Sequence, residues 1–173
     1  MRSRRYYFGN MSQPGRKSST HASPEVTASS PAQTGDAPVV PVSANQRRFL
    51  LAEQLTDANY GLPLVYSVQG SLDVEALREA IATIIARHSA LRSHFIQNES
   101  GFAATVLSEL AEWWSEIDLR GTDSNEAAER FAQHLNQPFD LWSGPLIRCV
   151  LGRESEYRWQ IGVSVHHSIA DGV

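Results

Sequence analysis

The chain carries Val165-His166-His167-Ser168-Ile169-Ala170-Asp171-Gly172-Val173 directly after a long apolar stretch, so two adjacent histidines follow the expected end of a strand. Loops at strand ends are where a rigid scaffold presents reactive groups. An imidazole is neutral over much of the physiological pH range and can accept a proton there. This segment is therefore the candidate functional site of the sequence.

Other interpretations of the histidine pair stay open on these residues alone. The histidines are able to cap a strand without doing chemistry, and a buried ion pair through Asp171 is compatible with any function. A metal site needs a third or fourth ligand, and no cysteine cluster or second histidine cluster offers one. A serine hydrolase needs a Gly-x-Ser-x-Gly elbow, which surrounds neither Ser164 nor Ser168.

The composition is that of a globular protein that binds neither membranes nor nucleic acid. Apolar residues make up 42% of the 173 residues and charged residues 20%. No run approaches the roughly 18 consecutive apolar residues that a membrane span needs. Residues 41–173 hold ten basic and seventeen acidic residues, a net charge of −7. A segment this acidic lacks the basic face that neutralises phosphates.

The single cysteine of the chain bears on the cellular compartment in which the protein is expected. One cysteine excludes an internal disulfide framework and fits a reducing environment, so we expect a cytoplasmic protein. Cys149 lies in the apolar run 145–151. A buried structural thiol is expected there in preference to a nucleophile.

Residues 1–40 differ in composition from the rest of the chain. They hold five basic and two acidic residues, and from Ser18 to Pro38 they consist mainly of Ser, Thr, Pro, Ala and Gly. Such a segment cannot bury enough apolar surface to offset the entropy lost on ordering. We predict a disordered leader over residues 1–40 and one folded unit over residues 41–173.

Hydrophobic periodicity predicts the elements of the folded unit. Helices are expected over 43–55, 73–88 and 123–137, and strands over 62–69, 91–97, 102–107, 114–119, 146–152 and 157–165. Asp73 and Asp123 are suited to begin helices. The apolar stripes are Leu77, Ile81, Ile84 and Ile85 in one helix and Ala127, Phe131 and Leu135 in another. Helices mixed with hairpins predict an α/β (α+β) sandwich with a mixed, mostly antiparallel sheet.

Four segments of the chain resemble one protein family. His166-His167-Ser168-Ile169-Ala170-Asp171-Gly172 matches the HHxxxDG signature of the condensation domains of nonribosomal peptide synthetases, within the chloramphenicol-acetyltransferase-like family. Residues 43–51 (SANQRRFLL) resemble the SxAQxRxWxL motif, residues 87–95 (RHSALRSHF) the RHxxLRTxF motif, and residues 139–148 (FDLWSGPLIR) the FDL…GPLxR stretch. The resemblance covers residues 43–173, with its motifs in the family's order.

The chain departs from the family's motifs at several positions. Asn45 stands where the first motif has Ala, and Ser93 stands where the second motif has Thr. The expected fold is the N-terminal lobe of a chloramphenicol-acetyltransferase-like domain, truncated after the histidine motif, with the C-terminal lobe as a missing partner. The resemblance implies that the two lobes together enclose the substrates.

The resemblance also implies a reaction. The expected activity forms an amide bond between an acyl or peptidyl thioester and an aminoacyl amine. In the family both substrates are held on 4'-phosphopantetheine arms of carrier proteins. We therefore expect no cofactor bound directly to this chain.

The resemblance further implies which residues act. His167 matches the catalytic position, where it is expected to accept or share the proton of the attacking amine and to position that amine. Asp171 matches the motif aspartate that pairs with an arginine of the second motif, for which Arg92 is the first candidate and Arg87 the second. Gly172 is expected to let the loop turn close to a substrate arm. The remaining site residue, His166, is expected to be structural.

Two alternatives stand beside amide-bond formation. The first is a sister activity, either epimerisation of a carrier-bound aminoacyl group or O-acyl transfer. The second is a truncated lobe without catalytic activity that serves as an interaction module. Family motifs that follow the histidine motif would separate the first alternative from the main hypothesis.

Overall fold

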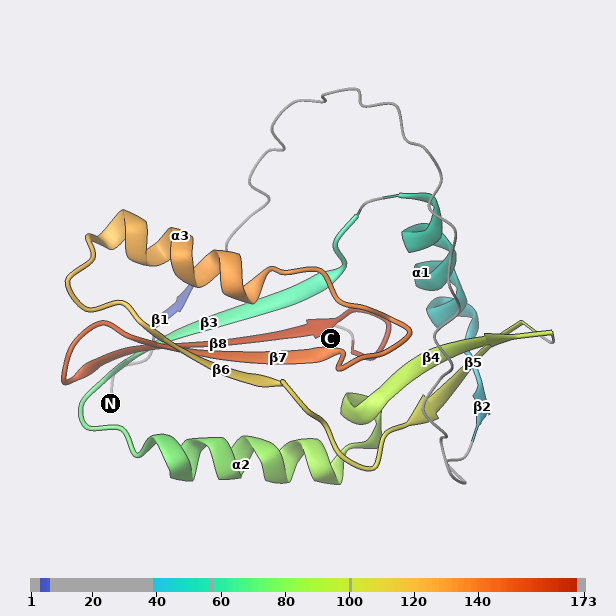
Figure 1. Cartoon of the computed structure of the whole chain (residues 1–173), viewed down its shortest axis with the longest axis horizontal. Helices are drawn as coiled ribbons and strands as arrows, with labels where there is room; N and C mark the ends of the chain where they lie inside the picture. Colours follow the sequence, from blue (N-terminus) through green and yellow to red (C-terminus); the bar gives the residue numbers. More distant parts are fainter. Residues whose placement is uncertain (1–3, 7–38, 57, 100, 171–173) are drawn as a thin grey trace.

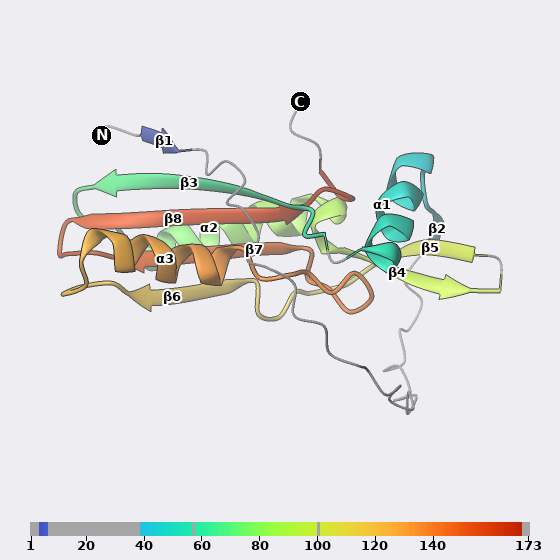
Figure 2. The same cartoon turned by 90° about the horizontal axis from the view of Figure 1, so that it is seen from above.

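The computed structural model describes residues 4–6, 39–56, 58–99 and 101–170. Within these ranges the chain forms a five-stranded sheet of order β1-β3-β8-β7-β6 and a three-stranded sheet of order β2-β5-β4. Helices α2 and α3 cover opposite faces of the larger sheet, and α1 stands beside the smaller one (Figures 1 and 2). Across the same ranges, no helix combines the length and the hydropathy that crossing a bilayer requires.

From residue 43 onward, the α-helices and strands follow the order that the sequence predicts. The strands are β1 (Arg4–Tyr6), β2 (Val40–Pro41), β3 (Gly61–Gln69), β4 (Ser93–Asn98), β5 (Gly101–Val106), β6 (Trp114–Asp118), β7 (Ile147–Arg153) and β8 (Arg158–His166). The helices are α1 (Ala44–Leu55), α2 (Val74–Arg87) and α3 (Ser124–Leu135), with a 3₁₀ turn η1 (Ser89–Arg92). Only β6 and β7 pair in parallel among the described strands, joined by α3. The predicted mixed, mostly antiparallel arrangement is confirmed.

The three α-helices begin where polar side chains satisfy their first N–H groups. Ser43 and Gln46 form a reciprocal capping box at the start of α1. Asp73 and Asp123 each accept hydrogen bonds from backbone N–H groups in the first turns of α2 and α3. Each such cap stabilises its helix by about 1 kcal/mol, so the helix starts are determined locally.

Helix α3 lies close against the sheet because two strand residues beneath it lack a side chain. A Cβ added at Gly162 would lie 2.9 Å from ring atoms of Phe131, and one at Gly152 would lie 2.9 Å from Phe131 Cδ2. The close approach buries the face that the sequence predicts for this helix. Its members are Ala127, Phe131 and Leu135.

Two predictions about the α2 region are wrong. Ile84 was expected on the buried stripe, but it is 51% exposed, because Ile81 and Ile85 already occupy the surface that packs on the sheet. The strand expected from Leu91 begins at Ser93, because residues 89–92 form a 3₁₀ turn in which the Leu91 N–H bonds to the His88 carbonyl.

One short strand falls within the predicted leader. Arg4–Tyr6 pairs antiparallel with β3, in the register Arg4↔Ser67 to Tyr6↔Val65. These three residues therefore differ from the expected disorder. The physical reason is that β3 would otherwise leave one row of backbone groups unpaired at the sheet edge. Residues 1–3 and 7–38 lie outside the described residues, and their disorder stays a prediction.

The contact beneath α3 predicts the effect of one added methyl group. Gly162→Ala should lower the free energy of unfolding by about 1–3 kcal/mol, because the new Cβ overlaps the Phe131 ring in a closely packed layer. Urea denaturation measures the loss. Phe131→Leu should recover part of it in the double variant, giving a non-additive cycle. A Gly162→Ala chain as stable as wild type would contradict the close approach.

Candidate functional site

The backbone at the end of β8 holds the two histidines. His166 is the last residue of β8, faces Gly61 of β3 in the pairing register, and donates its N–H to the Leu146 carbonyl at 2.9 Å. His167 begins the following turn and donates its N–H to the Tyr60 carbonyl at 2.9 Å. The prediction that a strand ends at the histidine pair is confirmed. The backbone of both histidines is therefore held by residues that directly precede the two neighbouring strands, β7 and β3.

The His166 ring is fully buried and bonded at both nitrogens. Its Nε2 lies 2.6 Å from Glu53 Oε1, and its Nδ1 accepts the backbone N–H of Ser168 at 3.1 Å. Because an N–H donates to Nδ1, that nitrogen carries the lone pair and Nε2 carries the proton, which it donates to Glu53. Burial lowers the pKa of His166, although the nearby Glu53 carboxylate acts in the opposite direction. The ring is thus bonded at both nitrogens in a solvent-excluded position, which supports the structural role expected for His166; that role stays a prediction.

The His167 ring has the opposite tautomer. Its Nδ1 lies 3.1 Å from the Ala170 carbonyl oxygen, which can only accept, so Nδ1 carries the proton. Nε2 is then left with a lone pair. The ring stacks on Phe49 with centroids 4.7 Å apart and planes 26° apart. A half-buried imidazole with one nitrogen anchored and the other unprotonated is arranged to accept a proton.

Aromatic side chains surround the pair. Phe49, Tyr60 and Phe139 each lie edge-on to the His166 ring, with centroids 6.0–6.3 Å away. Phe49 also packs edge-on against Tyr60, with ring centroids 5.2 Å apart. Phe49 therefore packs against both histidine rings and against Tyr60. A pocket of about 280 Å³ opens beside this group, and its lining residues are Glu53, Thr56, Ala58, Asn59, Pro138 and Phe139.

Of the supporting residues predicted from the sequence, the structure describes the two arginines, Arg87 and Arg92. Asp171 and Gly172 lie outside the described residues. The Arg92 guanidinium donates to four backbone carbonyls, so it joins the end of α2 to the end of β5; the acceptors belong to Ile85, Ala86, Leu107 and Ser108. Arg87 is exposed as the last residue of α2. The pairing of Asp171 with an arginine stays a prediction.

Sequence reasoning missed Glu53, which is 113 positions from His166. A signal for it exists in the helix that contains it. Phe49 and Glu53 are four residues apart in α1, so they share one face of the helix. This spacing places Glu53 on the helix face that carries Phe49, but it does not identify His166 as the partner.

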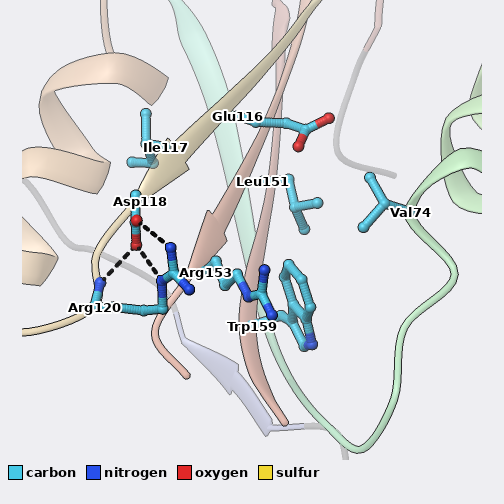
Figure 3. Close-up of a pocket in the computed structure, with 8 residues that line it drawn as sticks. All are labelled: Val74, Glu116, Ile117, Asp118, Arg120, Leu151, Arg153 and Trp159. Atoms are coloured by element: carbon cyan, nitrogen blue, oxygen red, sulfur yellow. Dashed lines mark hydrogen bonds and ion pairs between the residues drawn. The ribbon is translucent and has the colours of Figure 1, made fainter. Parts of the chain in front are cut away.

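A second polar pocket lies at the other end of the larger sheet (Figure 3). Its volume is about 340 Å³, and in it the Arg120 side chain donates two hydrogen bonds to Asp118 and its backbone N–H a third, while Arg153 lies over the Trp159 ring. Strand β8 runs seven residues from Trp159 to His166, a span of roughly 23 Å at about 3.3 Å per residue. This pocket therefore shares no group with the histidine site.

Fold and site together define an α/β protein that presents a histidine pair at the end of a sheet strand. The family model described as Condensation domain matches residues 37–173. The chain therefore belongs to the condensation-domain family.

The curated relatives carry the names of synthases. A component of the linear gramicidin synthase of Brevibacillus parabrevis is 38% identical over 140 residues, which are 77% of this chain and 3% of that protein. Chondramide synthase cmdD of Chondromyces crocatus is 37% identical over 142 residues, 79% of this chain and 4% of that protein. The chain thus spans only a few per cent of the length of these relatives.

Solved structures share the fold. The starter condensation domain of rhizomide synthetase RzmA superposes with a TM-score of 0.69 at 24% identity, covering 78% of this chain and 34% of that one. A four-domain nonribosomal peptide synthetase bound to AMP and glycine gives a TM-score of 0.72 at 18% identity, covering 79% and 11%. The expected fold class, a condensation-domain lobe, is confirmed.

The buried His166 predicts a pH dependence of stability. Below its ordinary pKa of 6.5 the unfolded chain protonates this residue while the folded chain resists, so the free energy of unfolding falls as the pH falls. The contribution reaches at most about 1.4 kcal/mol per pH unit. Urea denaturation at pH 7, 6 and 5 should show a smaller decline for His166→Asn than for wild type. The exposed His88, changed to Asn, is the control. Equal declines in wild type and His166→Asn would contradict the assignment.

Proposed function

We propose that this chain supplies the histidine-bearing lobe of a condensation domain, which joins an acyl or peptidyl thioester to an aminoacyl amine. The substrates are carried on 4'-phosphopantetheine arms of carrier proteins, and a complementary C-terminal lobe completes the site in the cytoplasm. The geometry of His167 carries the proposal, because Nδ1 is anchored on the Ala170 carbonyl and Nε2 is left to accept a proton. The named activities of the relatives, peptide synthases, support it.

The proposed reaction needs moderate chemical help from the protein. The amine attacks the thioester carbonyl, a C–N bond forms, and the proton shed by nitrogen passes to His167 Nε2. The tetrahedral intermediate then breaks its C–S bond, and the leaving thiolate takes the proton back from His167. An α-amino group has a pKa near 7.7–8.0, so a fraction is already neutral. General-base help contributes about 10²–10⁴-fold, and holding both substrates at attack distance contributes as much or more.

Stacking on Phe49 gives His167 its second role. A ring held between an aromatic face and the Ala170 carbonyl keeps one direction for its Nε2 lone pair. That direction positions the attacking amine as well as accepting its proton. In the proposed reaction, His167 therefore both accepts the proton of the attacking amine and positions that amine.

The motif aspartate is proposed to be structural. We assign Asp171 an ion pair with Arg87 in preference to Arg92, because carbonyl acceptors already occupy most of the N–H groups of Arg92. Such a pair would fix the loop that carries His167. Because Arg87 is exposed, the pair should stabilise the fold by no more than about 1 kcal/mol.

A double-mutant cycle distinguishes the two arginines. Asp171→Asn should lower the free energy of unfolding, and its effect should be non-additive with Arg87→Met, with a coupling of about 0.5–1 kcal/mol. Arg92→Met should destabilise the chain independently, because its carbonyl partners lose their donors. Coupling of Asp171 with Arg92 in place of Arg87 would reverse the assignment, and additivity with both would refute the pair.

Reconstitution tests the activity. The 173-residue chain, a separately expressed C-terminal lobe and two loaded carrier proteins should give the amide product, detected by mass spectrometry. The chain alone should give none, because one lobe supplies the histidine without the opposing wall that aligns the thioester. His167→Ala should remove the product, and the exposed His88→Ala should retain it.

Two outcomes of this assay would overturn parts of the proposal. Product that survives His167→Ala would exclude His167 as the base. Product from the chain alone that disappears in His167→Ala would show that one lobe suffices. An epimerised or O-acylated product in the complete mixture would favour the sister activities.

A further inference from the structure

Helix α1 is connected to His167 by a continuous series of contacts. Glu53 accepts the Nε2 proton of His166, and Nδ1 of the same ring accepts the backbone N–H of Ser168. The Ile169 N–H bonds to the His166 carbonyl at 3.1 Å. His167 lies between these bonded points, so the geometry of its turn depends on the state of the His166 ring.

The first step in the series is the choice of tautomer. The His166 ring is inaccessible to solvent, and among the described residues Glu53 is the acceptor within reach of its Nε2. A neutral imidazole carries one proton on its two ring nitrogens. A buried N–H without an acceptor loses its hydrogen bonds to water and forms no new one, which is unfavourable. The Glu53 carboxylate therefore keeps the proton on Nε2. Without that acceptor the ring gains by moving the proton to Nδ1.

The second step is the turn that follows β8. With the proton on Nε2, His166 Nδ1 is free to accept the Ser168 N–H at 3.1 Å and lies 2.6 Å from Ser168 Oγ. With the proton on Nδ1, that nitrogen would donate to Ser168 Oγ and could no longer accept the Ser168 N–H. The turn over 167–169 would keep the bond from the Ile169 N–H to the His166 carbonyl and lose the one from the Ser168 N–H to the ring. The tautomer with the proton on Nε2 is the one that allows both bonds.

The third step is the ring of His167 itself. The turn brings the Ala170 carbonyl within 3.1 Å of His167 Nδ1, and this bond keeps the Nε2 lone pair available. Helix α1 supports the same ring from the side, because Phe49, one helical turn before Glu53, stacks on it. One face of α1 therefore contacts both histidines.

The charges around His166 leave Glu53 as the group that acts on it. His167 is its neighbour in the chain, and Glu53 approaches from α1. From β7, Arg148 lies over the Phe139 ring with its centre 4.6 Å away, and its N–H groups bond to carbonyls of residues 135, 137 and 138. The arginine is therefore satisfied by backbone oxygen atoms, and Glu53 is the charged partner of the His166 ring.

We infer that Glu53 is a positioning residue for the condensation reaction, which acts through the His166 tautomer and the 167–169 turn to keep His167 protonated on Nδ1 and unprotonated on Nε2. The inference rests on the proposed function of His167. It adds a requirement that the histidine motif alone does not contain, a hydrogen-bond acceptor at position 53 of a distant helix. An amide oxygen at this position should serve nearly as well as a carboxylate.

The test reads the ring nitrogens directly. The 173-residue chain is labelled with ¹⁵N-histidine, and ¹⁵N chemical shifts distinguish protonated from unprotonated ring nitrogens at about pH 7.5, above the ordinary histidine pKa. Wild type should show His166 as the Nε2–H tautomer and His167 as the Nδ1–H tautomer. Glu53→Met fills a similar volume without an acceptor and should raise the minor tautomer of both histidines several-fold. Glu53→Gln retains an acceptor oxygen and should restore both wild-type patterns.

The neighbouring Gln54, which is exposed on the same helix, provides the matched control as Gln54→Met. It should leave both tautomers unchanged. The inference is wrong if Glu53→Met alters His166 while His167 keeps its Nδ1–H tautomer, because Glu53 would then only hold His166. It is also wrong if wild-type His167 already carries its proton on Nε2, a result that needs no variant to fold.

The spectra use neither carrier proteins nor a second lobe. A failure of amide formation in the reconstituted mixture would count against the proposed function and leave the tautomers as measured. A failure of the tautomer test would leave the amide-forming activity intact and remove only the role of Glu53. The two results are therefore distinguishable.

Discussion

The hydrogen bond between the buried His166 ring and Glu53 is the contact on which the site depends. It connects the end of β8 with helix α1, two parts of the chain 113 positions apart. A buried imidazole N–H without that acceptor would lower the stability of the fold by its uncompensated desolvation free energy. The bond thus holds the ring's proton on Nε2, and this leaves Nδ1 able to accept the Ser168 N–H of the next turn.

Apolar packing places α1 where this bond can form. Leu50 is fully buried in one cluster with Phe95, Leu141 and Leu146, which fixes the helix against the smaller sheet. Burying each such side chain stabilises a fold by about 1.5–3 kcal/mol, and one hydrogen bond to a charged group adds about 1.5–3 kcal/mol net. The four apolar side chains together outweigh the single polar contact, so the core decides where the helix lies. The bond to Glu53 then selects one tautomer of a ring already brought within reach.

Features that depend only on residues close together in the sequence could be predicted from the sequence. Asp73 and Asp123 begin helices through bonds to N–H groups two or three positions away, so a local pattern predicts them. Ile84 fits a helical stripe, but its exposure depends on how α2 lies on the sheet. Glu53 has no local pattern that identifies its partner, because only the folded chain brings it to His166. Local signals therefore predicted the elements and the motif, and tertiary packing determined how the motif is supported.

Two adjacent histidines acquire different roles because of the strand that precedes them. Successive residues of an extended segment point to opposite faces, so neighbours in sequence enter different surroundings. His166 enters a solvent-excluded layer beside Glu53, where burial favours the neutral ring. His167 enters a half-open position against Phe49, where one nitrogen remains available. His166, the last residue of β8, is still held in the sheet, whereas His167 begins the turn that leaves it. Adjacency is therefore what allows one imidazole to organise the turn while the other is presented to substrate.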